Sequence, residues 1–194
     1  MDSAPIHTEI RRAWRPGERL ILLGPGGVGK STLGLALAGV LGWSLIDLDF
    51  EFCQQVEMIG AFIAAHGYER YRLENLTLAE RLIGAASPST VFVTSSGFLA
   101  AGPDTGDRRR ADRLVAADYG ITLLPALEIA VATPIVVKRQ LVRGFGFERQ
   151  SETQKFRERF AIYRSTGDLL VASVASPRRT AASIVSTLGL GATV

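Results

Sequence analysis

The stretch Gly24-Pro25-Gly26-Gly27-Val28-Gly29-Lys30-Ser31-Thr32 matches the pattern G-x-x-x-x-G-K-[ST], which binds the phosphates of nucleotides. Glycines in such a loop let several backbone N–H groups point at one anion, and Lys30 can reach the outer phosphates. The Ser31 hydroxyl can bind Mg²⁺, and the positive end of a helix that starts here adds to the attraction. The whole stretch is therefore predicted to bind a nucleotide.

The sequence on both sides of this loop has the order that phosphate binding requires. Residues 19–23 form a short apolar run, which is typical of a buried strand. Residues 30–41 favour a helix, and Gly42 can end it. Strand, loop and helix in this order favour a phosphate site over a glycine turn that binds nothing.

Composition narrows the class of protein. The chain has 194 residues, 47% of them hydrophobic, which is enough for one domain with a core. A net charge of +3 suits small anionic ligands better than a nucleic-acid surface. No apolar run has bilayer length, residues 1–18 lack the apolar core of a signal peptide, and Cys53 is the single cysteine. We expect a cytoplasmic monomer that binds neither nucleic acid nor membrane.

Strands and helices alternate along the rest of the chain, which predicts a three-layer α/β/α domain with five parallel strands over residues 19–194. Residues 1–18 look like an extension, from which Trp14 can pack back on the domain. Further strands are expected at about 43–49, 91–94, 121–124 and 169–174. Helices are expected at about 50–65, 68–86, 108–117, 134–141 with Pro134 in the first turn, 151–165, and 177–188.

Two acidic residues stand at the expected end of the second strand. Asp47 and Asp49 are two positions apart, so on a strand they share a face. Ligands of parallel sheets bind beyond the carboxyl ends of the strands. One carboxylate can therefore act on metal-bound water and the other on a substrate hydroxyl. A solvated turn in which Asp49 caps the next helix explains the same spacing.

Several motifs together resemble the shikimate kinase family over about residues 19–190. That family has the phosphate loop, a D-x-D after the second strand, G-x-x-x-[FY]-R on a helix, a late-helix arginine four residues before a tyrosine, and S-P at the last helix. The matching residues here are Lys30-Ser31-Thr32, Asp47 and Asp49, Gly67 to Arg72, Arg159 with Tyr163, and Ser176-Pro177. The resemblance implies a P-loop kinase fold and phosphorylation by ATP and Mg²⁺ of a hydroxyl on a small carboxylated polyol, shikimate being the best candidate.

The resemblance also implies substrate-binding and metal-binding residues. Asp49 contacts substrate hydroxyls and accepts a proton, while Arg72 and Arg159 hold the carboxylate. Without the matched spacing, both arginines read as surface residues of helices. In this resemblance Ser31 is a direct ligand of Mg²⁺, and Asp47 contacts the ligands of the ion and not the ion itself.

Further positions of the two sites follow from the same resemblance. Arg139 lies against adenine, with Pro177 also on the nucleotide, and Arg143 closes over the phosphates as a catalytic residue beside Lys30. Arg143 reads equally well as a mobile surface arginine. Ser96 and Gly97 are expected next to the substrate.

The chain departs from the family pattern at two places. The family has three glycines after the third strand, where this chain has Ser95-Ser96-Gly97. The family has a glutamate three residues after the helix arginine, where this chain has Asn75. The two serines narrow the pocket or add hydroxyl contacts. A kinase for another hydroxy acid, such as gluconate, is therefore an alternative. A nucleotide-binding regulatory module without turnover is a separate alternative, against which the intact Lys30-Ser31 argues.

Overall fold

Residues 20–23 form the strand from which the rest of the sheet is built. In the computed structural model, which describes residues 4–142 and 148–191, strand β2 (Leu20–Leu23) is completely buried. Side chains alternate between the two faces of a strand, so Leu20 and Leu22 enter one apolar cluster and Ile21 and Leu23 enter another. A strand that is apolar on both faces must lie in the middle of a sheet covered on both sides.

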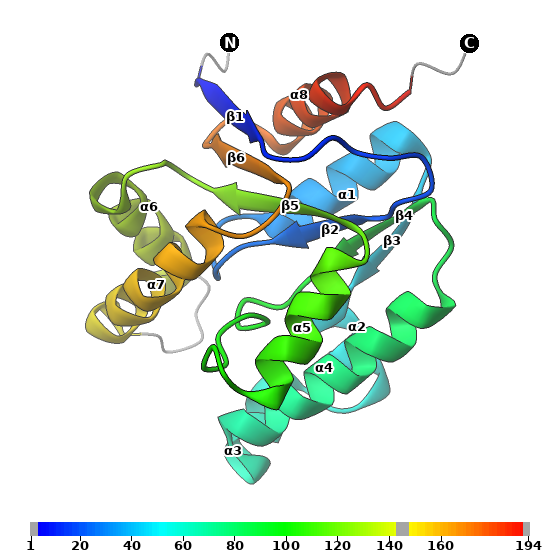
Figure 1. The fold of residues 1–194 in the computed structure, drawn as a ribbon. Coiled ribbons are helices and arrows are strands. Elements are labelled where there is room, and N and C mark those ends of the chain that lie inside the picture. The colour runs from blue at the N-terminus through cyan, green and yellow to red at the C-terminus, as the bar shows by residue number, and fades with distance from the viewer. Residues whose placement is uncertain (1–3, 143–147, 192–194) are drawn as a thin grey trace.

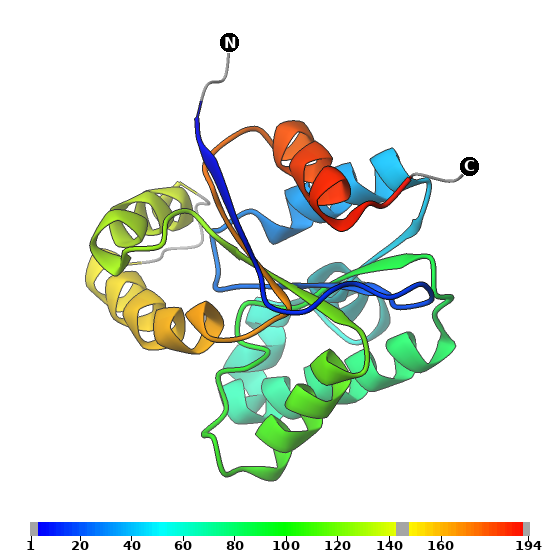
Figure 2. The same cartoon turned by 45° about the horizontal axis from the view of Figure 1, so that its top comes forward.

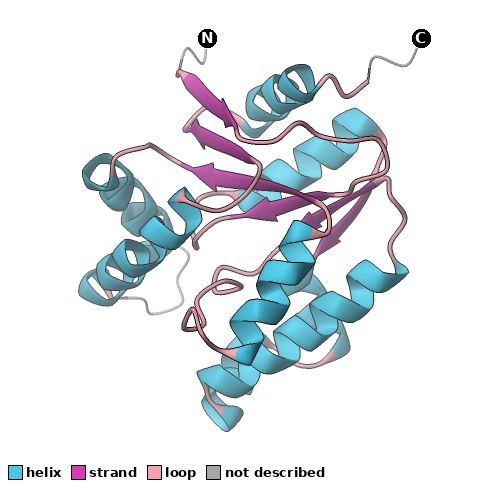
Figure 3. Cartoon of the chain, in the orientation of Figure 1, coloured by secondary structure: helices cyan, strands magenta, loops and turns pink. Residues whose placement is uncertain are grey.

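The sheet has six strands in the order β1-β6-β5-β2-β4-β3 (Figure 3). All pairs among β2 to β6 are parallel, and β1 pairs antiparallel with β6. From β2 the chain runs first to the edge strand β3, returns to β4 beside β2, and then crosses to β5 and β6 on the other side. The carboxyl ends of β4, β2 and β5 therefore lie next to one another. The other strands are β1 (Ile6–Ile10), β3 (Ser44–Asp47), β4 (Thr90–Val93), β5 (Tyr119–Leu124) and β6 (Leu169–Ser173).

Helices form the outer layers, as Figures 1 and 2 show from two sides. Helices α1 and α8 pack together over one face of the sheet, and α2 to α5 cover the other. Helices α6 and α7 pack as a pair near the carboxyl ends of β2 and β5. Their bounds are α1 (Lys30–Leu41), α2 (Leu48–Gln55), α3 (Ile59–His66), α4 (Tyr68–Ala85), α5 (Gly106–Ala116), α6 (Ile129–Leu141), α7 (Arg149–Arg164) and α8 (Pro177–Leu188).

The predicted α/β/α architecture is confirmed, but the sheet has six strands instead of five. The additional strand, β1, lies within the segment expected to be an extension. Its sequence Ile-His-Thr-Glu-Ile has too few apolar residues to predict a core strand, and it needs few because it pairs at an edge. Trp14 packs against the first apolar cluster, as expected.

Two helix predictions were wrong. Helix α6 starts at Ile129, so Pro134 lies inside it and not in its first turn. The residues before this proline, Ile-Ala-Val-Ala-Thr, carry β-branched side chains that suit a strand as well as a helix. The stretch 50–65 is divided into α2 and α3. None of the helices in residues 4–142 and 148–191 is long and apolar enough to cross a membrane.

An ion network fixes the N-terminal segment to the amino end of the sheet. The Arg12 guanidinium donates two hydrogen bonds to the Asp168 carboxylate, at 2.8 and 3.0 Å, and one to Glu18 at 2.7 Å. It also lies 5.1 Å from the centre of the Tyr119 ring. A bidentate contact to a carboxylate in a partly buried place is stronger than an exposed ion pair.

We expect Arg12→Ala to lower the free energy of unfolding by about 1–3 kcal/mol, because Asp168 and Glu18 lose their charged donor. Denaturant unfolding followed by circular dichroism measures this difference. Arg15→Ala is the matched control, since the Arg15 residue is exposed, and we expect a change within about 0.5 kcal/mol. Equal losses in both variants would contradict the role given to the network.

Candidate active site

The loop between β2 and α1 is built from glycines that cannot be replaced without strain. Gly24, Gly27 and Gly29 have φ angles of 147°, 77° and 100°, which side chains rarely allow. A Cβ atom on Gly24 would lie 2.6 Å from the Leu123 carbonyl oxygen, and one on Gly26 would lie 2.7 Å from Gln140 Nε2. The bare backbone therefore curls in front of α1, which is the shape expected of a phosphate-binding loop.

The Lys30 side chain lies inside this curl. It is only 8% exposed, and its ammonium group donates hydrogen bonds to the carbonyls of Gly24, at 2.8 Å, and Pro25, at 3.2 Å. Ser31 and Thr32 follow in the exposed first turn of α1. The fold thus fixes a positive charge and two hydroxyl groups at the positive end of a helix, an arrangement that suits phosphate.

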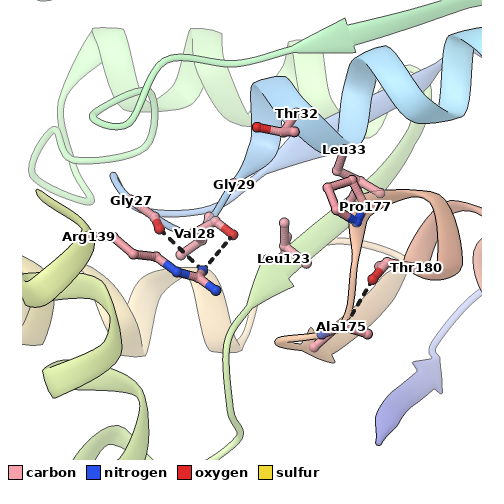
Figure 4. A pocket seen from close by; sticks show the side chains of 11 residues that line it. Gly27, Val28, Gly29, Thr32, Leu33, Leu123, Arg139, Ala175, Pro177 and Thr180 are labelled. Carbon is pink, nitrogen blue, oxygen red and sulfur yellow. Dashed lines mark hydrogen bonds between the residues drawn. The ribbon is translucent and has the colours of Figure 1, made fainter. Parts of the chain in front are cut away.

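A cavity of about 260 Å³ lies beside the loop, between α6 and the start of α8. Figure 4 shows Arg139 and Pro177 on opposite sides of it. The Arg139 guanidinium lies close to the Gly27 and Val28 carbonyls, at 3.5 and 3.4 Å, and Leu33 and Leu123 add apolar surface. The structure therefore brings Arg139 and Pro177 next to the loop, while their contact with a nucleotide stays a prediction. Arg143 lies outside the described residues.

The two acidic residues do not share a strand face, so that prediction was wrong. Strand β3 ends at Asp47 and α2 begins at Leu48. The Asp47 carboxylate accepts hydrogen bonds from the backbone N–H groups of Asp49, at 3.1 Å, and Phe50, at 3.4 Å, so Asp47 and not Asp49 caps the helix. Asp49 lies in the first turn of α2, where its carboxylate accepts a hydrogen bond from the Tyr71 hydroxyl at 3.3 Å.

Arg159 approaches the loop after β4 from α7. Its guanidinium donates to the Tyr68 hydroxyl at 3.0 Å and lies 3.5 Å from the carbonyl and the hydroxyl oxygens of Ser96. A Cβ atom on Gly97 would overlap the Tyr68 hydroxyl, so a glycine is needed for this approach. The neighbouring Tyr163 hydroxyl donates to the Ser96 carbonyl at 3.2 Å, which holds the loop against α7.

Arg72 reaches the same loop from α4. It lines a narrow cavity together with Ser95, Gly97 and Asp107. Its guanidinium pairs with Asp107 at 3.5 Å, while its Nε atom is buried and has no hydrogen-bond partner among the described residues. The two predicted arginines, which come from different helices, therefore both lie near Gly97.

Three contact residues of this region were missed from the sequence. The Tyr68 hydroxyl accepts a hydrogen bond from Arg159, and the Tyr71 hydroxyl donates one to Asp49. Asp107 of α5 is the acidic neighbour of Arg72. In the sequence, Asp107 directly precedes three arginines, Arg108 to Arg110, and this pattern indicates a solvent-exposed helix start. Tyr71 occupies the aromatic position of the G-x-x-x-[FY]-R motif, so its ring was expected but its hydroxyl contact was not.

A model of the shikimate kinase family matches residues 26–189. The chain belongs to the shikimate kinase family. Shikimate kinase 2 from Salmonella schwarzengrund is 26% identical over 174 residues, which cover 87% of this chain and 91% of that protein. Membership of this family, together with the loop around Lys30, makes the protein an ATP-dependent kinase.

Solved structures of other kinases have the same fold. A shikimate kinase from Acinetobacter baumannii in complex with shikimate superposes with a TM-score of 0.70 at 19% identity and covers 91% of this chain and 96% of its own. A gluconokinase from Sinorhizobium meliloti 1021 gives a TM-score of 0.52 at 18% identity, with 94% and 100% covered. At these identities the likeness establishes the P-loop kinase fold alone.

We expect Gly97→Ala to weaken binding of the phosphoryl acceptor and leave the fold intact. The added methyl group displaces the Tyr68 hydroxyl from Arg159, while Tyr68 is 38% exposed and can move outward. The KM for the acceptor should rise about tenfold, because about one hydrogen bond to a charged group is lost. Steady-state kinetics and thermal unfolding measure the two effects. Gly102→Ala is the control, because its Cβ meets only an ordinary contact at 3.5 Å, and an equal rise in KM there would contradict the assignment.

Proposed function

We propose that this kinase transfers the γ-phosphoryl group of ATP to a hydroxyl of a small carboxylated polyol, and that the substrate is shikimate, which becomes 3-phosphoshikimate. The observation that carries this proposal is that Arg72 and Arg159 both lie near Gly97, with the buried Nε of Arg72 lacking a hydrogen-bond partner among the described residues. Guanidinium groups match carboxylates with paired hydrogen bonds, so two of them favour an acidic substrate.

The loop and the cavity beside it suit ATP. Backbone N–H groups of Gly26 to Thr32 surround the phosphates, and the Lys30 ammonium, already held at the loop carbonyls, neutralises their charge. The base occupies the cavity between Arg139 and Pro177, whose apolar walls and flat guanidinium suit an aromatic ring. For Arg143, which lies outside the described residues, we propose the role at the phosphates that the family resemblance implies.

The same residues suit Mg²⁺, which takes few protein ligands and keeps several waters when it binds nucleotide phosphates. The exposed Ser31 hydroxyl is the direct ligand. Asp47 uses one oxygen to cap α2, which leaves the other for a metal-bound water. No group of three His, Cys, Asp or Glu residues in the described ranges could hold a metal ion by itself, so the phosphates complete the site.

Asp49 is the residue that acts on the substrate hydroxyl. Its carboxylate accepts a hydrogen bond from that hydroxyl and takes the proton as the oxygen forms its bond to phosphorus. Phosphoryl transfer depends chiefly on positioning and on charge neutralisation, so the orientation of one hydroxyl matters more than strong basicity. The position of Asp49 at the first turn of α2, beside the carboxyl end of the sheet, supports this assignment.

A panel of acceptors tests the substrate and the arginines together. ADP release should be fastest with shikimate, slower with gluconate, and slow with the analogue of shikimate that has an alcohol in place of the carboxylate. Arg72→Ala and Arg159→Ala should each weaken binding of shikimate about ten- to a hundredfold, the loss of one charge-assisted hydrogen bond. The double variant should deviate from the sum of the singles, because both arginines hold one group.

Two results would change the assignment. If ADP release is faster with gluconate than with shikimate, gluconate and not shikimate is the substrate. Equal losses for the acid and for its alcohol analogue would show that the arginines act on the fold or on phosphate, and the acidic substrate would be wrong.

We expect Asp49→Asn to reduce kcat by about a hundredfold or more, since it keeps the shape and removes the group that accepts the proton. Binding of ATP, measured by calorimetry, should change little, because Asp49 is assigned to the other substrate. Asp104→Asn is the matched control, because Asp104 lies exposed in a loop before α5. Loss of ATP binding with normal kcat at saturation would place Asp49 in the nucleotide site instead.

A further inference from the structure

A row of buried polar side chains runs from the end of β4 to Asp49. The Ser95 hydroxyl donates to Asn75 Oδ1 at 2.6 Å, the Asn75 amide donates to the Tyr71 hydroxyl at 3.5 Å, and that hydroxyl donates to Asp49 Oδ1 at 3.3 Å. Ser95, Asn75 and Tyr71 are 3%, 2% and 6% exposed. Only the last member of the row, Asp49, is partly exposed toward solvent.

Packing alone does not require these polar groups. The Tyr71 ring lies edge-on to Phe52 at 5.0 Å and belongs to the second apolar cluster, a place that a phenylalanine would fill equally well. A buried hydroxyl or amide is unfavourable unless it is hydrogen bonded. The three side chains form hydrogen bonds with one another, and the row of hydrogen bonds ends at the Asp49 carboxylate.

All the donors in the row point the same way. Each group donates to the next, and the final acceptor is a carboxylate, which is the order in which hydrogen bonds strengthen one another. Burial, and after it the negative charge of Asp49, raise the pKa of the Tyr71 hydroxyl. Tyr71 therefore stays protonated and remains a donor to Asp49.

We infer that Tyr71, Asn75 and Ser95 are positioning residues that hold the Asp49 carboxylate in the orientation needed for phosphoryl transfer. This inference rests on the proposed function, because it takes Asp49 to be the group that meets the substrate hydroxyl. The Tyr71 hydroxyl holds the Oδ1 atom of that carboxylate at 3.3 Å and so restricts how the carboxylate can rotate. Asn75 holds the Tyr71 hydroxyl, and Ser95 acts on that hydroxyl both through the Asn75 amide and by its own side-chain hydrogen bond to Tyr71.

The first test removes one oxygen atom with Tyr71→Phe. We expect kcat to fall about tenfold, since the carboxylate loses one charged hydrogen bond, while KM for ATP and for shikimate stays within about twofold. Tyr119→Phe is the matched control: its hydroxyl donates to the Arg12 carbonyl at the amino end of the sheet, so kcat should not change. An unchanged kcat in Tyr71→Phe would overturn the inference.

The second test separates positioning from a structural role. Ser95→Ala should lower kcat several-fold in the wild-type background and have no further effect on kcat in the Tyr71→Phe background, because Ser95 acts through Tyr71. A merely structural contribution would multiply in the double variant and would move the midpoint of thermal unfolding and KM along with kcat. Equal effects of Ser95→Ala in the two backgrounds would therefore also overturn the inference.

Asp49→Asn separates this inference from the proposed function. If Asp49→Asn turns over like wild type, the role of Asp49 is wrong and the proposed function loses its proton acceptor. If Asp49→Asn is inactive and Tyr71→Phe is fully active, the proposed function stands and the positioning row does not.

Discussion

Steric exclusion at the phosphate loop is the constraint on which the site depends. The loop passes so close to β5 and α6 that Cβ atoms on Gly24 and Gly26 would press on Leu123 and Gln140. The backbone is bare because its neighbours leave no room, and its N–H groups are exposed to an anion for the same reason. The contact with α6 also fixes Arg139 next to the loop carbonyls, so one close approach places both the phosphate site and the arginine beside it.

Parallel topology gathers the remaining groups. The loop follows β2, Asp47 ends β3 with Asp49 just beyond it, and Ser95 to Gly97 follow β4. Three connections therefore meet at the carboxyl ends of the strands. Helices α4 and α7 then bring Arg72 and Arg159 from outside the sheet to the same glycine. A sheet with antiparallel neighbours here would send alternate connections to opposite ends, and one of the charged groups would be lost from the site.

Local patterns predicted most of the fold because strand, loop and helix each leave a mark within a few residues. The loop, α1 and the alternation of elements were predicted for that reason. Strand β1 was not predicted, because an edge strand needs little apolar surface. The error at Asp47 has another cause. The same local sequence fits an aspartate that ends a strand and an aspartate that caps a helix. Only the hydrogen bonds from backbone N–H groups to the Asp47 carboxylate distinguish the two.

The site was predicted less completely, because its contacts join residues that are far apart in the chain. Asn75 and Ser95 each depart from the family pattern, and from the sequence each reads as an isolated change. In the fold they bond each other at 2.6 Å in a buried place. A serine at 95 without the amide would lose this short hydrogen bond, and an asparagine at 75 without the serine would bury a carbonyl oxygen that has lost its donor. The two departures are therefore one structural change, and the Tyr71 hydroxyl that it supports links that change to Asp49.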